Sequence, residues 1–250
     1  MNSYLLKGKT AVVTGCSRGI GRSILEKFVQ NGANCIACVR KSDTKFEDYC
    51  KNLSSKNNVK IDVVSFDLSK KDEVLDGVKK IFSINKKIDI LVNNAGILFN
   101  SLFQMTSEKN LKEIFEVNFF SHVTLTQLVS REMAKNKSGS IIFISSTSAK
   151  RNDIGRFAYS STKAAISSTS RVLAKELGNY KIRVNTICPG LTDTDMSKSN
   201  TREDFMKEEL NKISLKRLAE PNEIANVAVF LASDLSSYIS GQDIIVDGGV

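Results

Sequence analysis

The sequence contains one histidine, two prolines and no tryptophan among 250 residues. A single histidine cannot build a histidine-rich metal centre, and a Ser-His-Asp hydrolase would depend on this one residue. That residue, His122, falls on the apolar stripe of a predicted helix, and no G-x-S-x-G motif accompanies it. We therefore interpret His122 as a packed core side chain, and the sequence predicts neither a metal site nor a histidine-based hydrolase.

Long hydrophobic runs are also missing. No apolar run approaches the ~18 residues of a membrane-spanning helix, and residues 1–7 lack the apolar core of a signal peptide. Hydrophobic residues nevertheless make up 41% of the chain, which is typical of a folded globule. These observations predict a cytoplasmic protein without membrane association, built as a single domain over residues 1–250.

Lysine and arginine outnumber the acidic residues and give the chain a formal net charge of +9. An excess of this size can indicate nucleic-acid binding. The lysines are scattered among acidic residues, however, and no recognisable DNA-binding or RNA-binding motif is present. We interpret the charge as belonging to solvated helix faces and predict no nucleic-acid partner.

Two of the five cysteines form a C-x2-C pattern, Cys35 and Cys38, inside an apolar run. A spacing of three residues places them on opposite faces of a strand. No second cysteine pair or histidine cluster completes a zinc site. We expect both to be buried as small hydrophobic side chains, and all five to be free thiols in a reducing compartment.

Short apolar runs alternate with amphipathic stretches along the whole chain. This alternation predicts strands and helices in turn, and so a parallel sheet with right-handed crossovers. The expected fold class is α/β, a single doubly wound, Rossmann-like sheet of about seven strands with helices on both faces and ligand sites at the carboxyl ends of the strands. The predicted strands are residues 10–14, 34–39, 59–66, 88–93, 139–145, 181–188 and 243–246, and the predicted helices are residues 19–31, 43–56, 70–85, 107–137, 159–179, 201–213 and 220–234.

Tyr159 and Lys163 lie four residues apart in a predicted helix, so their side chains share one face of it. A nearby ammonium group favours the tyrosinate and lowers the pKa of the tyrosine. A phenol tuned in this way can donate a proton near neutral pH. Ser146 ends an apolar run thirteen residues upstream and is the candidate hydrogen-bond donor beside this pair.

A glycine-rich turn, residues 14–21, follows the first predicted strand and opens the first predicted helix. Glycines allow a close approach of the backbone, and the helix N-terminus presents free N–H groups, which together suit a pyrophosphate. The glycine spacing is G-x3-G-x-G. The alternative is a tight strand-to-helix turn that binds no ligand.

The chain resembles the short-chain dehydrogenase/reductase family in an ordered set of motifs, and within it the bacterial 3-oxoacyl-[acyl-carrier-protein] reductases. The resemblance extends from Leu6 to Gly249 and implies NADPH-dependent reduction of a ketone to a secondary alcohol. The motifs that carry it are residues 14–21, Asn93-Asn94-Ala95-Gly96, Asn118, Ser146, Tyr159, Lys163 and Pro189-Gly190.

For the reaction, the resemblance implies that Tyr159 donates the proton with the aid of Lys163, while Ser146 donates a hydrogen bond to the carbonyl oxygen. Lys163 would also lie near the ribose hydroxyls of the cofactor. Asn118 would hold a water molecule that links Lys163 to solvent. Structural bonding between helices is the alternative for Asn118, because an amide on an apolar helix face must find partners.

The residues after the second predicted strand favour NADP(H). An acidic residue there would bind the ribose hydroxyls and repel a 2′-phosphate, but none occurs before Asp43. Arg40, and Arg18 in the glycine turn, are cations that suit a 2′-phosphate, and exposed loop charges are the alternative. The cofactor-binding positions that the resemblance implies are Gly15, Ser17, Arg18, Gly19, Ile20, Gly21, Arg40, Asp67, Leu68, Asn94, Ala95, Gly96, Tyr159, Lys163, Pro189, Gly190, Thr192 and Thr194.

The resemblance favours a 3-oxoacyl thioester on an acidic acyl carrier protein as the substrate, as in fatty acid synthesis. Lys135, Lys137 and Lys181 resemble in position the basic patch that docks the carrier, although Tyr180 stands where an arginine is often seen. The apolar stretch 98–103 also departs from the more polar sequence common in those reductases. The segments expected to select the substrate are residues 97–107, 147–157 and 191–214, read as loops and a lid helix.

Two other functions remain open. One alternative is an NAD(P)-dependent dehydrogenase or reductase of another alcohol or ketone, such as a sugar or a cyclic ketone. The other is a cofactor-binding regulatory protein without turnover. The intact set of Ser146, Tyr159 and Lys163 argues against the regulatory protein. Family members are mostly tetramers that pack the helices predicted at 107–137 and 159–179, so a homotetramer is predicted.

Overall fold

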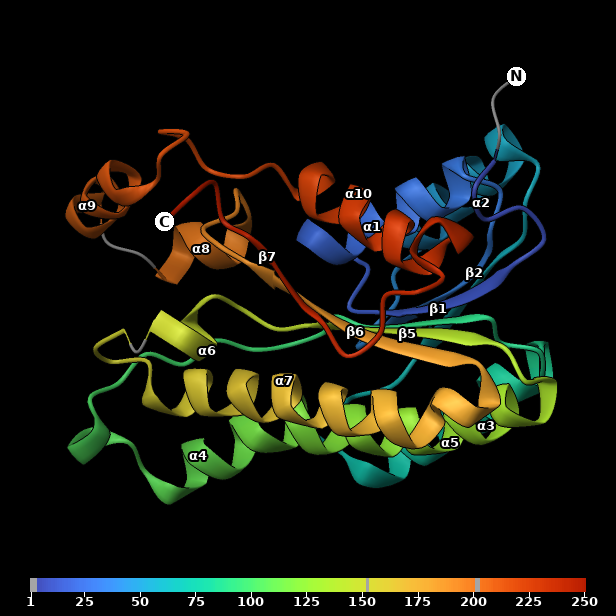
Figure 1. Cartoon of the computed structure of the whole chain (residues 1–250), viewed down its shortest axis with the longest axis horizontal. Coiled ribbons are helices and arrows are strands. Elements are labelled where there is room, and N and C mark those ends of the chain that lie inside the picture. Colours follow the sequence, from blue (N-terminus) through green and yellow to red (C-terminus); the bar gives the residue numbers. More distant parts are fainter. Residues whose placement is uncertain (1–3, 152, 201–202) are drawn as a thin grey trace.

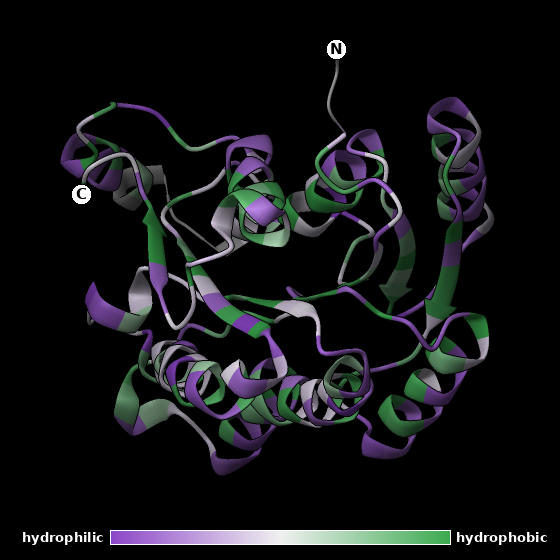
Figure 2. Ribbon diagram, turned by 45° about the vertical axis from the view of Figure 1, so that its right-hand side comes forward, coloured by the Kyte–Doolittle hydropathy of each residue, from purple (hydrophilic) through white to green (hydrophobic). Residues whose placement is uncertain are grey.

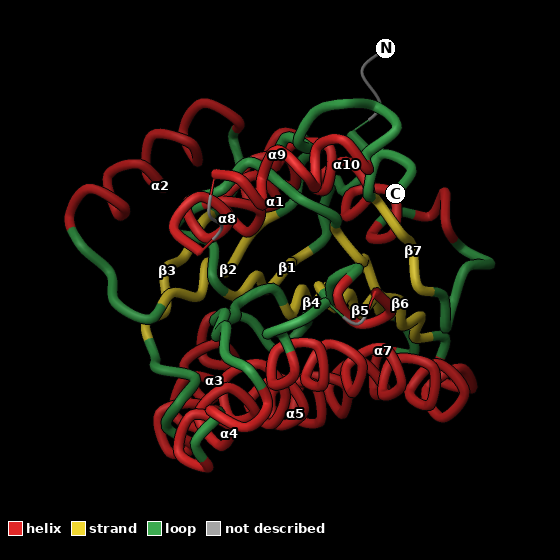
Figure 3. The backbone as a smooth tube through the Cα atoms, turned by 90° about the vertical axis from the view of Figure 1, so that its left-hand side faces the viewer, coloured by secondary structure: helices red, strands yellow, loops and turns green. Residues whose placement is uncertain are grey.

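Seven parallel strands form one sheet in the computed structural model, which describes residues 4–151, 153–200 and 203–250. The strand order is β3-β2-β1-β4-β5-β6-β7, and Figure 3 views the sheet from the edge where the strands end. The strands are β1 (Thr10–Thr14), β2 (Asn34–Val39), β3 (Ile61–Ser65), β4 (Ile90–Asn93), β5 (Gly139–Ile144), β6 (Ile182–Pro189) and β7 (Asp243–Val246).

Helices cover both faces of this sheet (Figure 1). One face carries α1, α2 and α10, and the opposite face carries α3, α5 and α7, while α6, α8 and α9 lie at the carboxyl edge. The bounds are α1 (Gly19–Gln30), α2 (Thr44–Asn57), α3 (Lys71–Ile84), α4 (Glu108–Phe115), α5 (Ser121–Asn136), α6 (Ser148–Arg151), α7 (Phe157–Leu177), α8 (Asp195–Asn200), α9 (Glu203–Lys212) and α10 (Pro221–Ala232).

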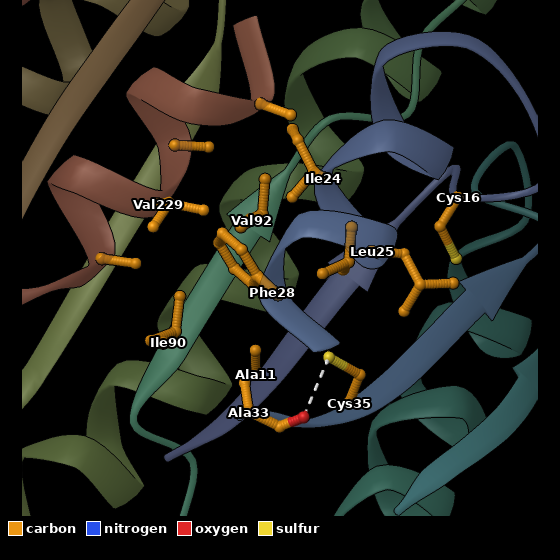
Figure 4. Close-up of a cluster of buried hydrophobic side chains, with 14 of the residues drawn as sticks. Ala11, Cys16, Ile24, Leu25, Phe28, Ala33, Cys35, Ile90, Val92 and Val229 are labelled. Atoms are coloured by element: carbon orange, nitrogen blue, oxygen red, sulfur yellow. Dashed lines mark hydrogen bonds between the residues drawn. The ribbon is translucent and has the colours of Figure 1, made fainter. Parts of the chain in front are cut away.

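Alternate residues of each strand build two separate hydrophobic cores, one on each face. Ala11 and Val13 of β1 pack with Phe28 of α1, whereas Val12 between them packs on the other side. Figure 2 shows apolar residues along the strands and along the helices beside them, and Figure 4 shows the α1 side of the sheet in detail. Cys35 belongs to the first core and Cys38 to the second, which confirms that they lie buried on opposite faces of β2.

The doubly wound fold is confirmed, and each predicted strand is present with ends that differ by at most two residues. The chain moves outward from β1 to β2 and β3, then returns to place β4 on the other side of β1. Segments that leave the carboxyl ends of β1 and β4 therefore diverge, which opens a crevice at this switch point. In the described part of the chain, no helix is both long and apolar enough to cross a bilayer.

The helix predicted over residues 107–137 is present, with helical backbone throughout residues 108–136, but it is not regular along its length. A wider π-type turn, Glu116–Phe120, separates α4 from α5, and the backbone N–H of Ser121 donates to the carbonyl of Glu116, five residues back. This turn contains Asn118, whose side chain bonds outside its own helix. The apolar spacing along the segment does not reveal the extra residue, because it changes the helical phase only locally.

Two short helices, α6 and α8, occupy segments that we expected to be loops. The helix predicted at 201–213 is present as α9, and residues 201 and 202, like residue 152 of the expected substrate segment, lie outside the described residues. The helix predicted at 220–234 is present as α10, and Pro221 is its first residue, where a missing N–H breaks no helical hydrogen bond.

Gly77 of α3 tests the packing between that helix and the sheet. A Cβ at this position would lie 2.5 Å from the ring of Phe66, a core side chain. We expect Gly77→Ala to lower the free energy of unfolding by about 1–3 kcal/mol, because the ring must move in a packed core. The measurement is urea denaturation.

Gly178 supplies the matched control. It has φ −58, and a Cβ there would meet nothing within 4 Å. Gly178→Ala should leave stability unchanged or raise it by about 0.4–1 kcal/mol. Equal effects of the two substitutions would show that close packing at Phe66 is not the cause.

Candidate active site

A cleft of about 770 Å³ opens at the carboxyl edge of the sheet, over the switch point. Every position that the sequence predicts to bind cofactor lines it, together with Ser146. Asn118 is the exception among the predicted site residues, since it is fully buried behind the cleft wall. In the described residues, no group of three or more His, Cys, Asp or Glu side chains is placed to hold a metal ion.

The glycine turn packs directly against the end of β4. Gly15 has φ +66, which disfavours other residues, and a Cβ on it would lie 2.8 Å from Cα of Ala95. A Cβ on Gly21 would lie 2.3 Å from the carbonyl oxygen of Gly15. The absence of side chains leaves backbone N–H groups accessible on the cleft side, as a pyrophosphate requires.

The first turn of α1 has spare hydrogen-bond donors. Its N-cap is Arg18, whose side chain makes no cap hydrogen bond, and the turn contains no acidic residue. The free N–H groups of a twelve-residue helix therefore point into the cleft with the positive end of the helix dipole behind them. This geometry fits the phosphates of a dinucleotide.

Thr14 joins the two strands at the switch point, a role that sequence reasoning missed. Its Oγ1 accepts hydrogen bonds from the backbone N–H of Asn94 at 2.9 Å and of Ala95 at 3.1 Å. The Asn94 side chain donates in return to the carbonyl of Thr14 at 2.8 Å. The only available signal was a threonine at the end of the first strand, directly before the glycine turn.

The predicted cations flank the glycine turn and the end of β2. Arg18 lies 3.8 Å from Asp195 with both side chains largely exposed, and Arg40 is exposed. Partial burial would raise the pKa of Asp67, but hydrogen bonds from Ser69 and the charges of Arg40 and Lys70 lower it overall. Both arginines line the cleft, where each can turn toward a bound anion.

The segment after β6 is ordered by its own hydrogen bonds. Thr192 Oγ1 donates to the Gly190 carbonyl at 3.1 Å. Thr194 Oγ1 accepts from the backbone N–H of Ser197 at 3.3 Å, at the start of α8. The Thr194 hydroxyl lines the cleft but is already engaged in this turn.

Tyr159 and Lys163 share one face of α7, as predicted, with the ammonium 5.6 Å from the centre of the phenol ring. Lys163 Nζ donates to the carbonyl of Ile144 at 2.8 Å, and Ser145 Oγ donates to the Lys163 carbonyl at 2.9 Å. These bonds fix the start of α7 against the end of β5. Ser145 therefore anchors the helix, while Ser146 lines the cleft beside Tyr159.

The expected lowering of the tyrosine pKa by Lys163 is wrong for this structure. Burial raises the pKa of Tyr159 and outweighs the hydrogen bond with Ser146 and the charge of Arg156, which lower it. Burial also lowers the pKa of Lys163 to about 8, and its Nζ is directed at a carbonyl. The phenol therefore keeps its proton at neutral pH, which is the form that an acid catalyst needs.

Asn118 links the loop after β4 to α7. Its Oδ1 accepts from Ile97 N–H at 2.8 Å, and its Nδ2 donates to the Ile97 carbonyl at 3.0 Å and to Thr162 Oγ1 at 3.2 Å. Thr162 Oγ1 in turn donates to the Tyr159 carbonyl at 2.7 Å. The Asn118 side chain thus makes structural hydrogen bonds, one of them to the neighbouring helix α7, which is the alternative that we considered for this residue. That its backbone holds a water molecule stays a prediction.

A helix N-terminus with free N–H groups and a protonated phenol in one cleft suit the reduction or oxidation of a carbonyl–alcohol pair with a nicotinamide cofactor. Comparison with known proteins identifies the family within this class. A family model described as "Enoyl-(Acyl carrier protein) reductase" matches residues 15–250. The 3-oxoacyl-[acyl-carrier-protein] reductase FabG of Chlamydia muridarum is 40% identical over 250 residues, 100% of both chains. The chain belongs to the short-chain dehydrogenase/reductase family.

Solved structures show the same architecture. A 3-oxoacyl (acyl-carrier-protein) reductase from Agrobacterium tumefaciens with NADP bound is 28% identical, with a TM-score of 0.91 over 99% of this chain and 96% of that one. A 7α-hydroxysteroid dehydrogenase complexed with NADH and 7-oxo glycochenodeoxycholic acid is 34% identical, with a TM-score of 0.91 over the same shares. One architecture thus serves both nicotinamide cofactors and ketones of different shape.

His122 is buried with 1% exposure, as the core interpretation predicts, and its Nε2 has no hydrogen-bond partner. Burial, and to a smaller extent the charge of Lys163, lower its pKa from 6.5 to about 3. Between these pH values the unfolded chain binds a proton that the folded chain excludes. The free energy of unfolding therefore rises with pH across this window, by about 1 kcal/mol per pH unit.

His122→Gln should flatten this dependence between pH 6.5 and about 5, because no other side chain has its ordinary pKa there. The measurement is denaturant unfolding over this range, where the slope against pH matters and the absolute stability does not. An unchanged slope in the variant would mean that another group causes the effect.

Proposed function

We propose that the protein reduces a 3-oxoacyl thioester to the 3-hydroxyacyl thioester with NADPH. The observation that carries the proposal is the placement of Ser146, Tyr159 and Lys163 in the cleft that the glycine turn opens. Full-length similarity to 3-oxoacyl-[acyl-carrier-protein] reductases supports the thioester as substrate.

The proposed roles follow from where each proton is held. When bound, the nicotinamide supplies the hydride that the carbonyl carbon receives. Ser146 Oγ accepts from the backbone N–H of Ser148 at 3.1 Å, so its own proton can be donated either to the phenol oxygen of Tyr159 or to a substrate oxygen bound there. Tyr159 transfers its proton to that oxygen as negative charge develops there.

Lys163 would have two tasks in this reaction. Its pKa near 8 lets it exchange a proton at neutral pH, so it can return a proton toward Tyr159 after turnover. Lys163 also lines the cleft, a position that suits hydrogen bonds to ribose hydroxyls. Asn118 is proposed to hold the connecting water with its backbone, at the π-type turn where the regular helical hydrogen bonding is interrupted.

The preference for NADPH rests on Arg18 and Arg40. Both line the cleft, and no acidic residue follows β2 before Asp43 that would repel a 2′-phosphate. The Agrobacterium reductase binds NADP, whereas the steroid dehydrogenase binds NADH, so the family alone does not select the cofactor.

The lysines proposed to dock an acyl carrier, Lys135, Lys137 and Lys181, are exposed at the amino ends of β5 and β6. The cleft lies at the opposite, carboxyl edge. A carrier docked on these lysines therefore cannot serve the cleft of the same subunit, and the docking proposal requires a second copy of the chain. The proposed homotetramer could supply it, and exposed Phe120, which ends the π-type turn before α5, and Val172 on α7 support helix packing between subunits.

The cysteines support the proposed cytoplasmic location, because all five are free and buried, and burial raises the pKa of each thiol. Such thiols persist in a reducing compartment.

A cyclic ketone is the second candidate substrate, favoured by the likeness to the steroid dehydrogenase.

The first test is NADPH oxidation with acetoacetyl-CoA, followed by the loss of NADPH absorbance. We expect turnover, with Tyr159→Phe reducing kcat about 100-fold or more because the proton donor is lost. Fluorescence titration should show that the variant still binds NADPH.

No turnover of acetoacetyl-CoA in a chain that binds NADPH would reject the thioester. A panel of sugars and cyclic ketones would then identify the substrate. Full activity of Tyr159→Phe would instead reject the role of the phenol.

Arg40→Asp tests the cofactor preference. The new carboxylate should repel the 2′-phosphate, so KM for NADPH should rise about tenfold or more while KM for NADH stays nearly constant. Lys45→Gln is the control, because Lys45 is an exposed cation on α2 that does not line the cleft. Equal changes in both KM values would show that Arg40 does not contact the phosphate.

A further inference from the structure

The helix that covers the substrate end of the cleft is held by a buried carboxylate. Among residues 206–212 of α9, Glu209 is the one buried residue, with 3% exposure, and it lines the cleft. The next buried anchor, Ile213, follows the end of the helix. Within residues 206–212 the apolar side chains Met206 and Leu210 are only partly buried, so in this part of the helix the partners of Glu209 make the most deeply buried contact.

Glu209 has two cationic partners of different kinds. Arg151 Nη2, at the end of α6, bonds to Oε2, and this pair joins two separate elements across the cleft. Lys212 Nζ bonds to Oε1 at 2.6 Å, but Lys212 belongs to α9 itself and is half exposed. Burial would raise the pKa of Glu209, yet these two cations lower it overall, so the carboxylate is charged at neutral pH.

A chain of contacts continues from Arg151 to Ser146. Arg151 Nε lies 3.5 Å from Asp153 Oδ1, and Asp153 Oδ2 accepts from Ser148 Oγ at 3.1 Å. The backbone N–H of Ser148 donates to Ser146 Oγ at 3.1 Å. The position of α9 is thus connected to the orientation of the hydroxyl that would hold the substrate oxygen.

We infer that Arg151 and Glu209 form an ionic latch, which closes α9 over bound substrate and, through Asp153 and Ser148, sets the orientation of Ser146. The inference rests on the proposed function, since that proposal gives Ser146 its role. Arg151 and Glu209 are positioning residues, because they act through Ser146 and α9 rather than on the reacting atoms.

An ion pair suits a lid better than apolar packing does. Desolvation offsets much of the attraction between two buried charges, so the closed state has little net advantage and can reopen to release product. Loss of Glu209 leaves Arg151 with Asp153 alone, and loss of Arg151 leaves Glu209 with Lys212 of its own helix. Either loss therefore removes the ion pair that joins α6 to α9. The latch is therefore weak as a whole but sensitive to each of its members.

Glu209→Gln tests the latch with little change of size. We expect amide hydrogen exchange in residues 203–212 to accelerate about tenfold or more, while exchange in the sheet is unchanged. We expect kcat to fall about tenfold with NADPH binding retained, since the phosphate-binding turn is untouched. Arg151→Gln should produce both effects, and the double variant should be no worse than either single variant.

Lys212→Gln is the matched control. It removes the other partner of the same carboxylate, but one that cannot connect α9 to α6. Exchange in α9 and kcat should both stay close to those of the unmodified protein. Equal effects of Lys212→Gln and Arg151→Gln would overturn the latch, as would faster exchange throughout the sheet, which indicates general destabilisation.

A different role for Arg151 would give a distinct result. If the guanidinium binds an anionic group of the substrate, Glu209→Gln would free it and lower KM, whereas Arg151→Gln would raise KM, and this opposite pattern would overturn the latch. Hydrogen exchange separates the inference from the proposed function. Absence of turnover with every ketone rejects the function, while unchanged exchange of α9 in Glu209→Gln rejects the latch.

Discussion

The hydrogen bonds between Thr14 and Asn94 are the constraint on which the rest of the site depends. They join the ends of β1 and β4, the two strands from which the chain departs in opposite directions. Because these ends are fixed, the glycine turn can pack against Ala95 with no room for a side chain. The glycine turn, the N-terminus of α1 and the wall next to Lys163 are all positioned from this junction.

Burial then sets the protonation states in the cleft. One physical cause acts on both members of the pair, since desolvation disfavours the charged forms of Tyr159 and Lys163 alike. The tyrosine retains its proton and the lysine releases its proton more readily than in water. This combination supports a phenol that gives a proton to a substrate oxygen and an amine that can pass one on. The same burial keeps His122 neutral and outside the chemistry.

The molecule uses two different ways to hold its elements together. The sheet and its covering helices are joined by two apolar cores with side chains as large as Phe28 and Phe143. At the substrate end, α6 and α9 are joined by the charges of Arg151 and Glu209. Close-packed cores resist motion, whereas a paired charge can separate into water when the cleft opens. By this argument the sheet with its apolar cores is the rigid part, under the proposed cofactor site. The segment held by Arg151 and Glu209 is the part that moves, over the proposed substrate site.

The sequence by itself determined the fold class, the seven strands, the placement of most site residues at strand ends, and the family. These features follow from local periodicity and from motifs whose spacing is short, so neighbouring residues suffice to recognise them. Only the tertiary structure decided the direction in which the pKa of Tyr159 shifts, the hydrogen bonds of Thr14, the π-type turn at Asn118 and the ion pair of Arg151 with Glu209. Each of these depends on burial or on contacts between residues far apart in the chain. No local pattern encodes how deeply a group is buried or which distant charge faces it.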